Sequence, residues 1–305
     1  MKTFVKRHTF GAGKYIYDGY FNAWFNPDYF DQISDLEPHI GHEYRIMAVD
    51  ADIQKREHLD PLAAARVAWV YVQPNEFPMP WGGHPNFVST CPDEMIEELN
   101  RMDNVRLWTF GGETKYHTKW RAPIHSIPLA FDLPGYTFLN HVGKEEFEFD
   151  VAFIGGWADN GFNEKMAIMK EYFAAFKESN LRCGFSVNRG ISTAQEVHLL
   201  RRSKVAINIH DAYQRKLGLD TNERTFKAIG VNGMLVSDEI KHIADLKLLT
   251  DGVTMARGVD EMVSMVREFC DMPDSFLIAM KEKNRKMIAD AHTYEHRTEL
   301  MRSLE

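Results

Sequence analysis

A basic side chain near the start of a predicted helix is the first feature of this sequence that could do chemistry. Residues 218–239, GLDTNERTFKAIGVNGMLVSDE, predict a turn, a helix and a buried strand, with Arg224 in the first helical turn. A cation there is unfavourable by roughly 0.3–1 kcal/mol, because helix starts carry partial positive charge. A bound anion such as phosphate reverses that sign, since free N–H groups and a guanidinium both donate to it. The alternative is an ion pair with Glu223 or Asp220, which together have the spacing of a capping box.

Two further strand ends carry residues that suit a ligand. FIGGW puts Gly155 and Gly156 at the end of a strand, where the backbone is open to close approach. INIHDAY ends another strand in His210 and Asp211. Each of these features is also explained by an ordinary turn. Three such ends within one domain favour a site for a nucleotide diphosphate.

The first half of the chain offers acidic residues instead. VDAD places Asp50 and Asp52 directly after a predicted strand, and Asp52 is a candidate general base. The acids could equally serve only to end the strand. FGAGKY lacks the first glycine and the final hydroxyl of a P-loop, so we interpret it as a loop before a helix. The 13 histidines show no zinc-binding spacing, and we expect no metal site.

The elements that would position these residues can be predicted from short apolar runs that alternate with helical patterns. Such alternation predicts βαβ units and parallel sheets, with ligands at the carboxyl ends of the strands. In the first half we expect strands at residues 44–50, 67–72, 86–90, 104–110 and 125–131, and in the second half at residues 149–156, 182–187, 204–210 and 233–237. The predicted fold is α/β, with an N-terminal domain over residues 1–135 and a second domain over 148–285. Residues 275–304 are expected to be helical throughout, and residues 286–305 could pack back on the first domain.

Composition limits the class of protein. The chain has 305 residues, 44% of them hydrophobic, and a net charge of −8, which does not attract a nucleic-acid backbone by default. Neither a signal peptide nor a membrane span is predicted. The three cysteines are far apart and odd in number, as is typical of reduced thiols in a cytoplasmic protein.

Several motifs of the second half together resemble a known family. They are NIH at residues 208–210, RTFKAIGVNGMLVS at 224–237, HSIPLAFD before the linker and HTYEHR at 292–297. Residues 149–297 resemble the C-terminal donor-binding domain of GT-B glycosyltransferases, most of all the CgeB-like, glycosyltransferase family 1-like group. The resemblance implies two Rossmann-like domains that face a cleft. The first would bind the acceptor and the second a nucleotide-sugar.

The resemblance also implies roles for individual residues. Arg224 would grip the donor diphosphate, Gly155 and Gly156 would border the donor, and His210 would line the same cleft. The remaining donor-binding candidates lie on the helix that carries Arg224: Asn222, Glu223, Thr225 and Lys227. Lys227 stands where the family has a glutamate, and it cannot accept a hydrogen bond from a ribose hydroxyl. Glu223 is a possible substitute for that glutamate.

The expected activity is transfer of a hexose or pentose from a UDP-, GDP- or ADP-linked donor to an acceptor hydroxyl, without a metal or other cofactor. Arg224 would stabilise the leaving diphosphate, and Asp52 would be the base if the enzyme inverts. The acceptor is a glycan, a protein or a lipid, with a modified DNA base less favoured. The alternatives are a GT-B-shaped binding protein without activity, which Lys227 favours, and a metal-dependent GT-A-type enzyme that uses Asp50 and Asp52.

Overall fold

The chain folds into two compact units. A computed structural model describes residues 1–73, 76–82, 91–136, 146–157 and 164–305. The first unit contains Met1–Pro128 and Tyr294–Glu305, and the second contains Leu129–Thr293. None of the helices in the described ranges is long and apolar enough to cross a membrane.

The first unit is built on a six-stranded parallel sheet with the order β2-β1-β3-β4-β5-β6. The strands are β1 (Lys2–Lys6), β2 (Pro27–Phe30), β3 (Tyr44–Val49), β4 (Val67–Tyr71), β5 (Val105–Thr109) and β6 (Ile124–Ser126). The helices are α1 (Gly11–Ala23), α2 (Leu59–Ala64), α3 (Asp93–Leu99) and α11 (Tyr294–Ser303). Every residue of β3 is buried, as expected for a parallel strand that is covered on both faces.

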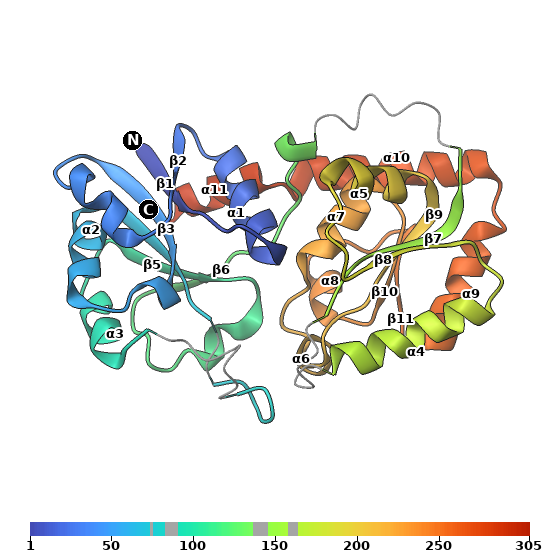
Figure 1. The fold of residues 1–305 in the computed structure, drawn as a ribbon, viewed down its shortest axis with the longest axis horizontal. Helices are drawn as coiled ribbons and strands as arrows, with labels where there is room; N and C mark the ends of the chain where they lie inside the picture. The colour runs from blue at the N-terminus through green and yellow to red at the C-terminus, as the bar shows by residue number, and fades with distance from the viewer. Residues whose placement is uncertain (74–75, 83–90, 137–145, 158–163) are drawn as a thin grey trace. The chain divides into compact units, whose positions relative to one another are not determined.

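The last helix, α11, closes the first unit although it lies at the far end of the sequence (Figure 1). The rings of Tyr20 in α1 and Tyr294 in α11 lie 4.8 Å apart between centroids. The chain ends in Glu305, whose carboxylate pairs with the buried Arg45 of β3. Aromatic packing and a largely buried ion pair therefore hold the C-terminus against this sheet.

The second unit has a five-stranded parallel sheet with the order β11-β10-β9-β7-β8 (Figure 1). Its strands are β7 (Phe149–Gly155), β8 (Cys183–Val187), β9 (Ser203–Asn208), β10 (Leu235–Asp238) and β11 (Val253–Ala256). Helices α4 (Lys165–Glu178) and α9 (Val259–Cys270) pack together on one face, and α5 (Thr193–Arg201), α7 (Glu223–Val231) and α10 (Asp274–Ala291) cover the other. Two short helices, α6 (Ala212–Leu217) and α8 (Lys241–Asp245), follow β9 and β10.

Both sheets have the strand order of a doubly wound fold, which confirms the predicted α/β class. In each sheet the chain starts at an inner strand, moves one way and then crosses to the other side. The crossing point lies between β1 and β3 in the first unit and between β7 and β9 in the second. Ligands of such folds bind outside the carboxyl ends of the strands at this switch point.

The structure corrects several predicted elements. Strands β1 and β2 were not predicted, because each offers only a very short apolar run. The strand predicted at 125–131 leaves the sheet after Ser126, two residues before Pro128, which has no N–H to donate to a neighbouring strand. The tail is not one helix: α10 ends at Ala291, where the His292 carbonyl accepts a hydrogen bond from the Phe131 N–H, 2.8 Å away. The strand predicted at 86–90 lies outside the described residues.

Candidate functional site

The switch point of the second unit brings Gly155, Asn208 and Arg224 together. Strand β7 ends at Gly155 and β9 ends at Asn208, while Arg224 lies in the first turn of α7. A Cβ placed on Gly155 would lie 2.5 Å from Nη2 of Arg224, so the guanidinium lies directly against the glycine backbone. A glycine is therefore needed at this strand end to admit the arginine.

Arg224 has neutral hydrogen-bond partners. Its Nη1 donates to Oδ1 of Asn208 at 2.9 Å and approaches the Ile209 carbonyl at 3.4 Å. The guanidinium also lies 4.9 Å from the centre of the buried Phe153 ring. Over the described ranges, no carboxylate forms an ion pair with Arg224, so the predicted alternative of a pair with Glu223 or Asp220 is not seen. A partly exposed cation with donors to spare is suited to an anion.

The start of α7 differs from the predicted capping box. Asn222 occupies the N-cap position, and Glu223 is the first helical residue. Asp220 lies further back and is buried, where its Oδ2 accepts a hydrogen bond from Gln214 at 2.9 Å. The side chain of Asn222 accepts from Nδ2 of Asn208 at 2.9 Å instead of capping the helix. The first N–H groups of α7 therefore receive no side-chain cap from Asn222, the residue placed to supply one.

Behind Asn208 lies a buried polar cluster that contains two more of the candidate residues. Thr225 is fully buried, and its hydroxyl accepts from Nδ2 of Asn208 at 2.9 Å. His210 is 0% exposed, with Nδ1 located 2.6 Å from the Asp238 carboxylate and Nε2 located 2.8 Å from the Thr221 hydroxyl. Burial raises the pKa of Asp238, but its interactions with His210, which include two hydrogen bonds, and the charge of Arg215 outweigh burial and lower this pKa overall. Both ring nitrogens of His210 are thus engaged inside the unit, and its predicted role of lining the donor site stays a prediction.

Lys227 pairs with a carboxylate of the neighbouring helix. Its ammonium lies 2.8 Å from Oε1 of Glu196 in α5, and Oε2 of Glu196 accepts from the Tyr136 hydroxyl at 2.7 Å. Burial and the nearby charge of Glu196 raise the pKa of Tyr136, which keeps this hydroxyl protonated. The acid that the family resemblance places on α7 is therefore replaced by a lysine, and the adjoining helix supplies the opposite charge.

Lys165 is a residue near the site that the sequence analysis missed. It is the first residue of α4 and is buried, with its ammonium 2.7 Å from the Ile209 carbonyl and 2.6 Å from Oδ1 of Asp211. Burial, and to a smaller extent the charge of Arg224, lowers its pKa, while Asp211 raises it. No local pattern marks this lysine, because its partners lie more than 40 residues away in the chain. It holds the loop after β9 in place behind Arg224.

Gly156 lies beside Asn188, whose Oδ1 accepts from the Trp157 N–H at 2.9 Å. This hydrogen bond joins the ends of β7 and β8, next to Gly155. The two glycines predicted to border the donor thus contact different neighbours, Arg224 in one case and Asn188 in the other. Donor contact by either glycine stays a prediction.

The switch point of the first unit carries the acidic candidates. Asp50 and Asp52 form a short turn directly after β3, and Asp52 forms an ion pair with Lys6 at the end of β1, 3.2 Å away. His8 lies in the same region, and burial lowers its pKa while the charge of Asp52 raises it. Among the described residues, no three His, Cys, Asp or Glu side chains are grouped as metal ligands. Asp52 lies where a ligand of this sheet would bind, and its role as a base stays a prediction.

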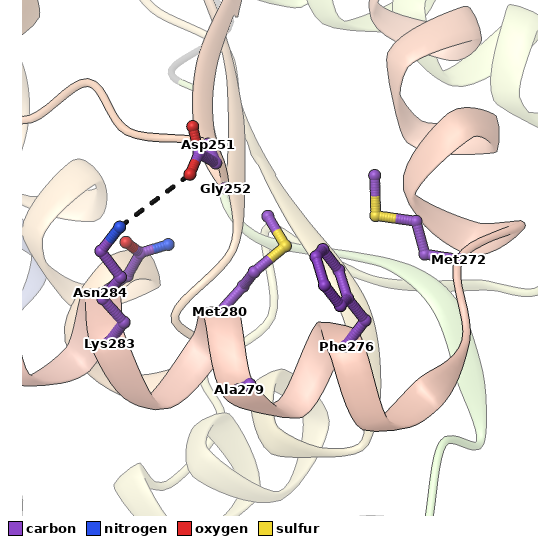
Figure 2. A pocket seen from close by; sticks show the side chains of 8 residues that line it. All are labelled: Asp251, Gly252, Met272, Phe276, Ala279, Met280, Lys283 and Asn284. Carbon is purple, nitrogen blue, oxygen red and sulfur yellow. Dashed lines mark ion pairs between the residues drawn. The ribbon is translucent and has the colours of Figure 1, made fainter.

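A separate pocket of the second unit lies at the amino ends of its strands, at the end of the sheet opposite to Arg224. Figure 2 shows Phe276 and Met280 of α10 beside Gly252, which precedes β11. At the mouth of this pocket, Lys283 lies 3.9 Å from Asp251. Because Gly252 marks the amino end of a strand, this pocket is not part of the edge that carries Arg224.

Comparisons with known proteins agree with this geometry. Residues 136–303, more than half of the chain, match the model of a family described as glycosyl transferase-like. No curated protein matches the sequence.

Among solved structures, BGT of T4 phage in complex with its UDP-glucose substrate is similar to this chain with a TM-score of 0.55 and 10% identity, over 100% of this chain and 98% of that one. The N-terminal domain of Candida albicans trehalose-6-phosphate phosphatase gives 0.49 and 9% identity, over 89% and 72% of the two chains. AviGT4, a glycosyltransferase involved in avilamycin A biosynthesis, gives 0.46 and 13%, over 89% and 86%. The similarity to the T4 phage structure confirms the GT-B fold, with two Rossmann-like units, for the whole chain.

Proposed function

Because this chain belongs to the glycosyl transferase-like family, we propose that it transfers a sugar from a nucleotide-diphosphate donor to an acceptor hydroxyl. The observation that carries the proposal is Arg224, a partly exposed guanidinium at a helix start and a sheet switch point, bonded to the amide of Asn208. Charge that develops on the leaving diphosphate would be stabilised there by the guanidinium and by the first N–H groups of α7. Such preorganised donors are typically the largest single contribution to catalysis of this kind.

The rest of the donor site follows from the same helix. Gly155 admits the guanidinium at the end of β7, and Asn222 and Thr225 support the guanidinium through Asn208. The donor would border Gly155 and Gly156 on this side of the site. Lys227 is held by Glu196, so we assign the ribose hydroxyls to Glu223, the carboxylate in the first turn of α7. His210 would act from behind this surface, because its side chain is fully buried.

We propose that the reaction needs no metal and that the first unit binds the acceptor. Asp52, at the switch point of that unit, is the base if the configuration at the transferred sugar is inverted. UDP is the first nucleotide to test, because the T4 phage protein with the same fold was solved with UDP-glucose. GDP- and ADP-linked hexoses or pentoses follow, with glycans, proteins or lipids as acceptors. Membership of the CgeB-like group and a cytoplasmic location, which the three free cysteines suit, are part of this proposal.

A thermal-shift screen with UDP, GDP, ADP and their sugars, with and without EDTA, tests the proposal. We expect one nucleoside diphosphate to raise the melting temperature in the presence of EDTA, and Arg224→Ala to abolish that rise. Arg257→Ala is the matched control, because Arg257 is an exposed arginine of the same unit after the edge strand β11. A rise that survives in Arg224→Ala would contradict the proposal. Binding without any sugar turnover would instead identify a GT-B-shaped binding protein, and a rise that EDTA abolishes would identify a metal-dependent enzyme.

A further inference from the structure

A buried histidine and aspartate lie behind the proposed donor site, and the proposed sugar transfer gives them no role. Nδ1 of His210 is 2.6 Å from Oδ1 of Asp238, and the His210 backbone N–H donates to Oδ2 of the same carboxylate at 3.0 Å. The side chains of His210 and Asp238 are 0% and 1% exposed. The carboxylate thus fixes both the backbone and the ring of the residue that follows the end of β9.

A continuous chain of hydrogen bonds leads from this pair to Arg224. Nε2 of His210 lies 2.8 Å from the Thr221 hydroxyl, which lies 2.6 Å from the Thr225 hydroxyl. Nδ2 of Asn208 is 2.9 Å from the Thr225 hydroxyl, and Oδ1 of Asn208 is 2.9 Å from Nη1 of Arg224. Every member between the aspartate and the arginine is buried.

Arg224 and Asp238, the two ends of this hydrogen-bond chain, have fixed hydrogen-bonding roles. A guanidinium only donates, so the Asn208 oxygen must face Arg224 and its NH₂ group must face Thr225. An ionised carboxylate only accepts, so Nδ1 of His210 must carry a proton toward Asp238. Arg215, whose Nε lies 3.4 Å from Asp238, balances the carboxylate charge and allows His210 to be neutral.

These ends fix the direction of every bond between them. Because the Thr225 oxygen accepts from Asn208, its own proton goes to Thr221, and the described residues give that proton no other acceptor. The Thr221 proton then goes to Nε2 of His210, which must be unprotonated. With a proton on Nε2, the Thr221 hydroxyl would donate to Thr225, and the Thr225 proton would have no acceptor unless Asn208 turned its oxygen away from Arg224.

We propose that Asp238 and His210 are positioning residues for Arg224: the Nδ1-protonated tautomer of His210, held by Asp238, orients Thr221, Thr225 and Asn208 so that an oxygen receives the guanidinium. Neither residue touches the donor. That Arg224 in turn binds a diphosphate rests on the proposed function, whereas the direction of the hydrogen-bond chain does not.

The tautomer of His210 can be measured without any nucleotide. In a sample with ¹⁵N-labelled histidine, NMR near neutral pH should show His210 with a protonated Nδ1 and an unprotonated Nε2. The spectrum of His210→Asn identifies the signals by their loss. The opposite tautomer, or a doubly protonated ring, would overturn the proposal.

Binding measurements test whether the chain positions Arg224. Thr221→Val removes the hydroxyl in the middle of the hydrogen-bond chain at nearly constant volume. Asn208 would then no longer be held with its oxygen toward Arg224. We expect UDP binding to weaken about tenfold, which is the effect of losing this one hydrogen bond to a charged group. Uridine binding should stay unchanged, because uridine has no diphosphate. Thr221→Ser should restore UDP binding. Ser203→Ala is the matched control, since it removes another buried hydroxyl of the same unit, bonded to the Leu199 carbonyl at 2.7 Å, and should leave UDP affinity unchanged.

The loss of UDP affinity in Thr221→Val must also depend on Arg224. In an Arg224→Ala background, Thr221→Val and Asp238→Asn should cause no further loss of UDP affinity. Equal losses of affinity for UDP and for uridine would show a general structural effect and overturn the proposal. A full additional loss of UDP affinity in the Arg224→Ala background would do the same. If the wild-type protein binds none of UDP, GDP and ADP, the proposed function fails, and the tautomer measurement alone decides the hydrogen-bond chain.

Discussion

Replacement of Gly155 by alanine gives a sharp test of how Arg224 is held. The added Cβ would lie 2.5 Å from Nη2, 2.7 Å from Cζ and 2.8 Å from Nε of Arg224. The backbone of Gly155 has no positive φ angle, so alanine is compatible with the strand. The guanidinium is the end of a flexible side chain and will move, which removes its hydrogen bond to Asn208.

The expected free-energy changes follow from two opposing effects. Loss of a hydrogen bond from a charged group costs about 1.5 kcal/mol, at the low end of the usual range because Arg224 is partly exposed. Alanine also restricts the unfolded chain and stabilises the protein by about 0.5 kcal/mol. Gly155→Ala should therefore lower the free energy of unfolding by about 1 kcal/mol. In Arg224→Ala, which has no guanidinium to displace, the same change should raise it by about 0.5 kcal/mol.

Urea unfolding of the four proteins in this cycle measures the coupling between the two positions, which we expect to be about 1.5 kcal/mol. UDP affinity should fall about tenfold in Gly155→Ala, since a displaced guanidinium no longer faces the diphosphate. If Gly155→Ala has the same effect on stability with and without Arg224, the two residues do not interact as the structure shows, and the reasoning is refuted.

Three further predictions concern other parts of the site. Glu196→Gln should destabilise the protein by about 2 kcal/mol in urea unfolding, because it removes a carboxylate partner of the largely buried Lys227, and Lys227→Met in the same chain should recover part of that loss. Folding lowers the pKa of Asp238 below its ordinary value of 3.8, so its stabilisation is fully present above that pH and is lost as the pH falls through the lowered value; Asp238→Asn should remove this part of the acid dependence of the melting temperature. Asp52→Asn should lower kcat about a hundredfold or more while UDP affinity is unchanged, and an unchanged kcat would exclude Asp52 as the base.

The sequence was informative where chemistry depends on local pattern. Alternation of apolar runs and helices predicted both parallel sheets, and the charge conflict at the start of α7 singled out Arg224. Glycine at the end of β7 suggested that a ligand approaches the backbone closely, although the neighbour observed there is Arg224 itself. These features could be predicted because each depends on residues that are close together in the chain.

The missed or wrong features depend on contacts across the fold. Lys165 and Asp238 are ordinary polar residues in sequence, and only the structure shows that both are buried against the loop after β9. Asp220 has capping-box spacing but accepts a hydrogen bond from Gln214, and the N-cap position is Asn222, whose side chain bonds to Asn208 instead. In the sequence, Lys227 only replaces the acid that the family resemblance places there. The structure shows that Glu196, on the neighbouring helix α5, supplies its partner carboxylate. Periodicity alone cannot reveal such tertiary partners.

The candidate residues at the two switch points have opposite charges, and this difference favours different tasks for the two units. At the switch point of the second unit, Arg224 and Lys165 lie close together, and the described structure pairs the lysine with Asp211 but leaves the arginine bonded only to neutral acceptors. At the switch point of the first unit, Asp52 forms an ion pair with Lys6, and the buried Asp50 precedes Asp52 by two residues. An excess of positive charge stabilises a leaving diphosphate, and an excess of carboxylate favours removal of a proton from an acceptor hydroxyl. This difference supports the proposed division of the reaction, in which the second unit stabilises the leaving diphosphate and the first unit removes the proton from the acceptor.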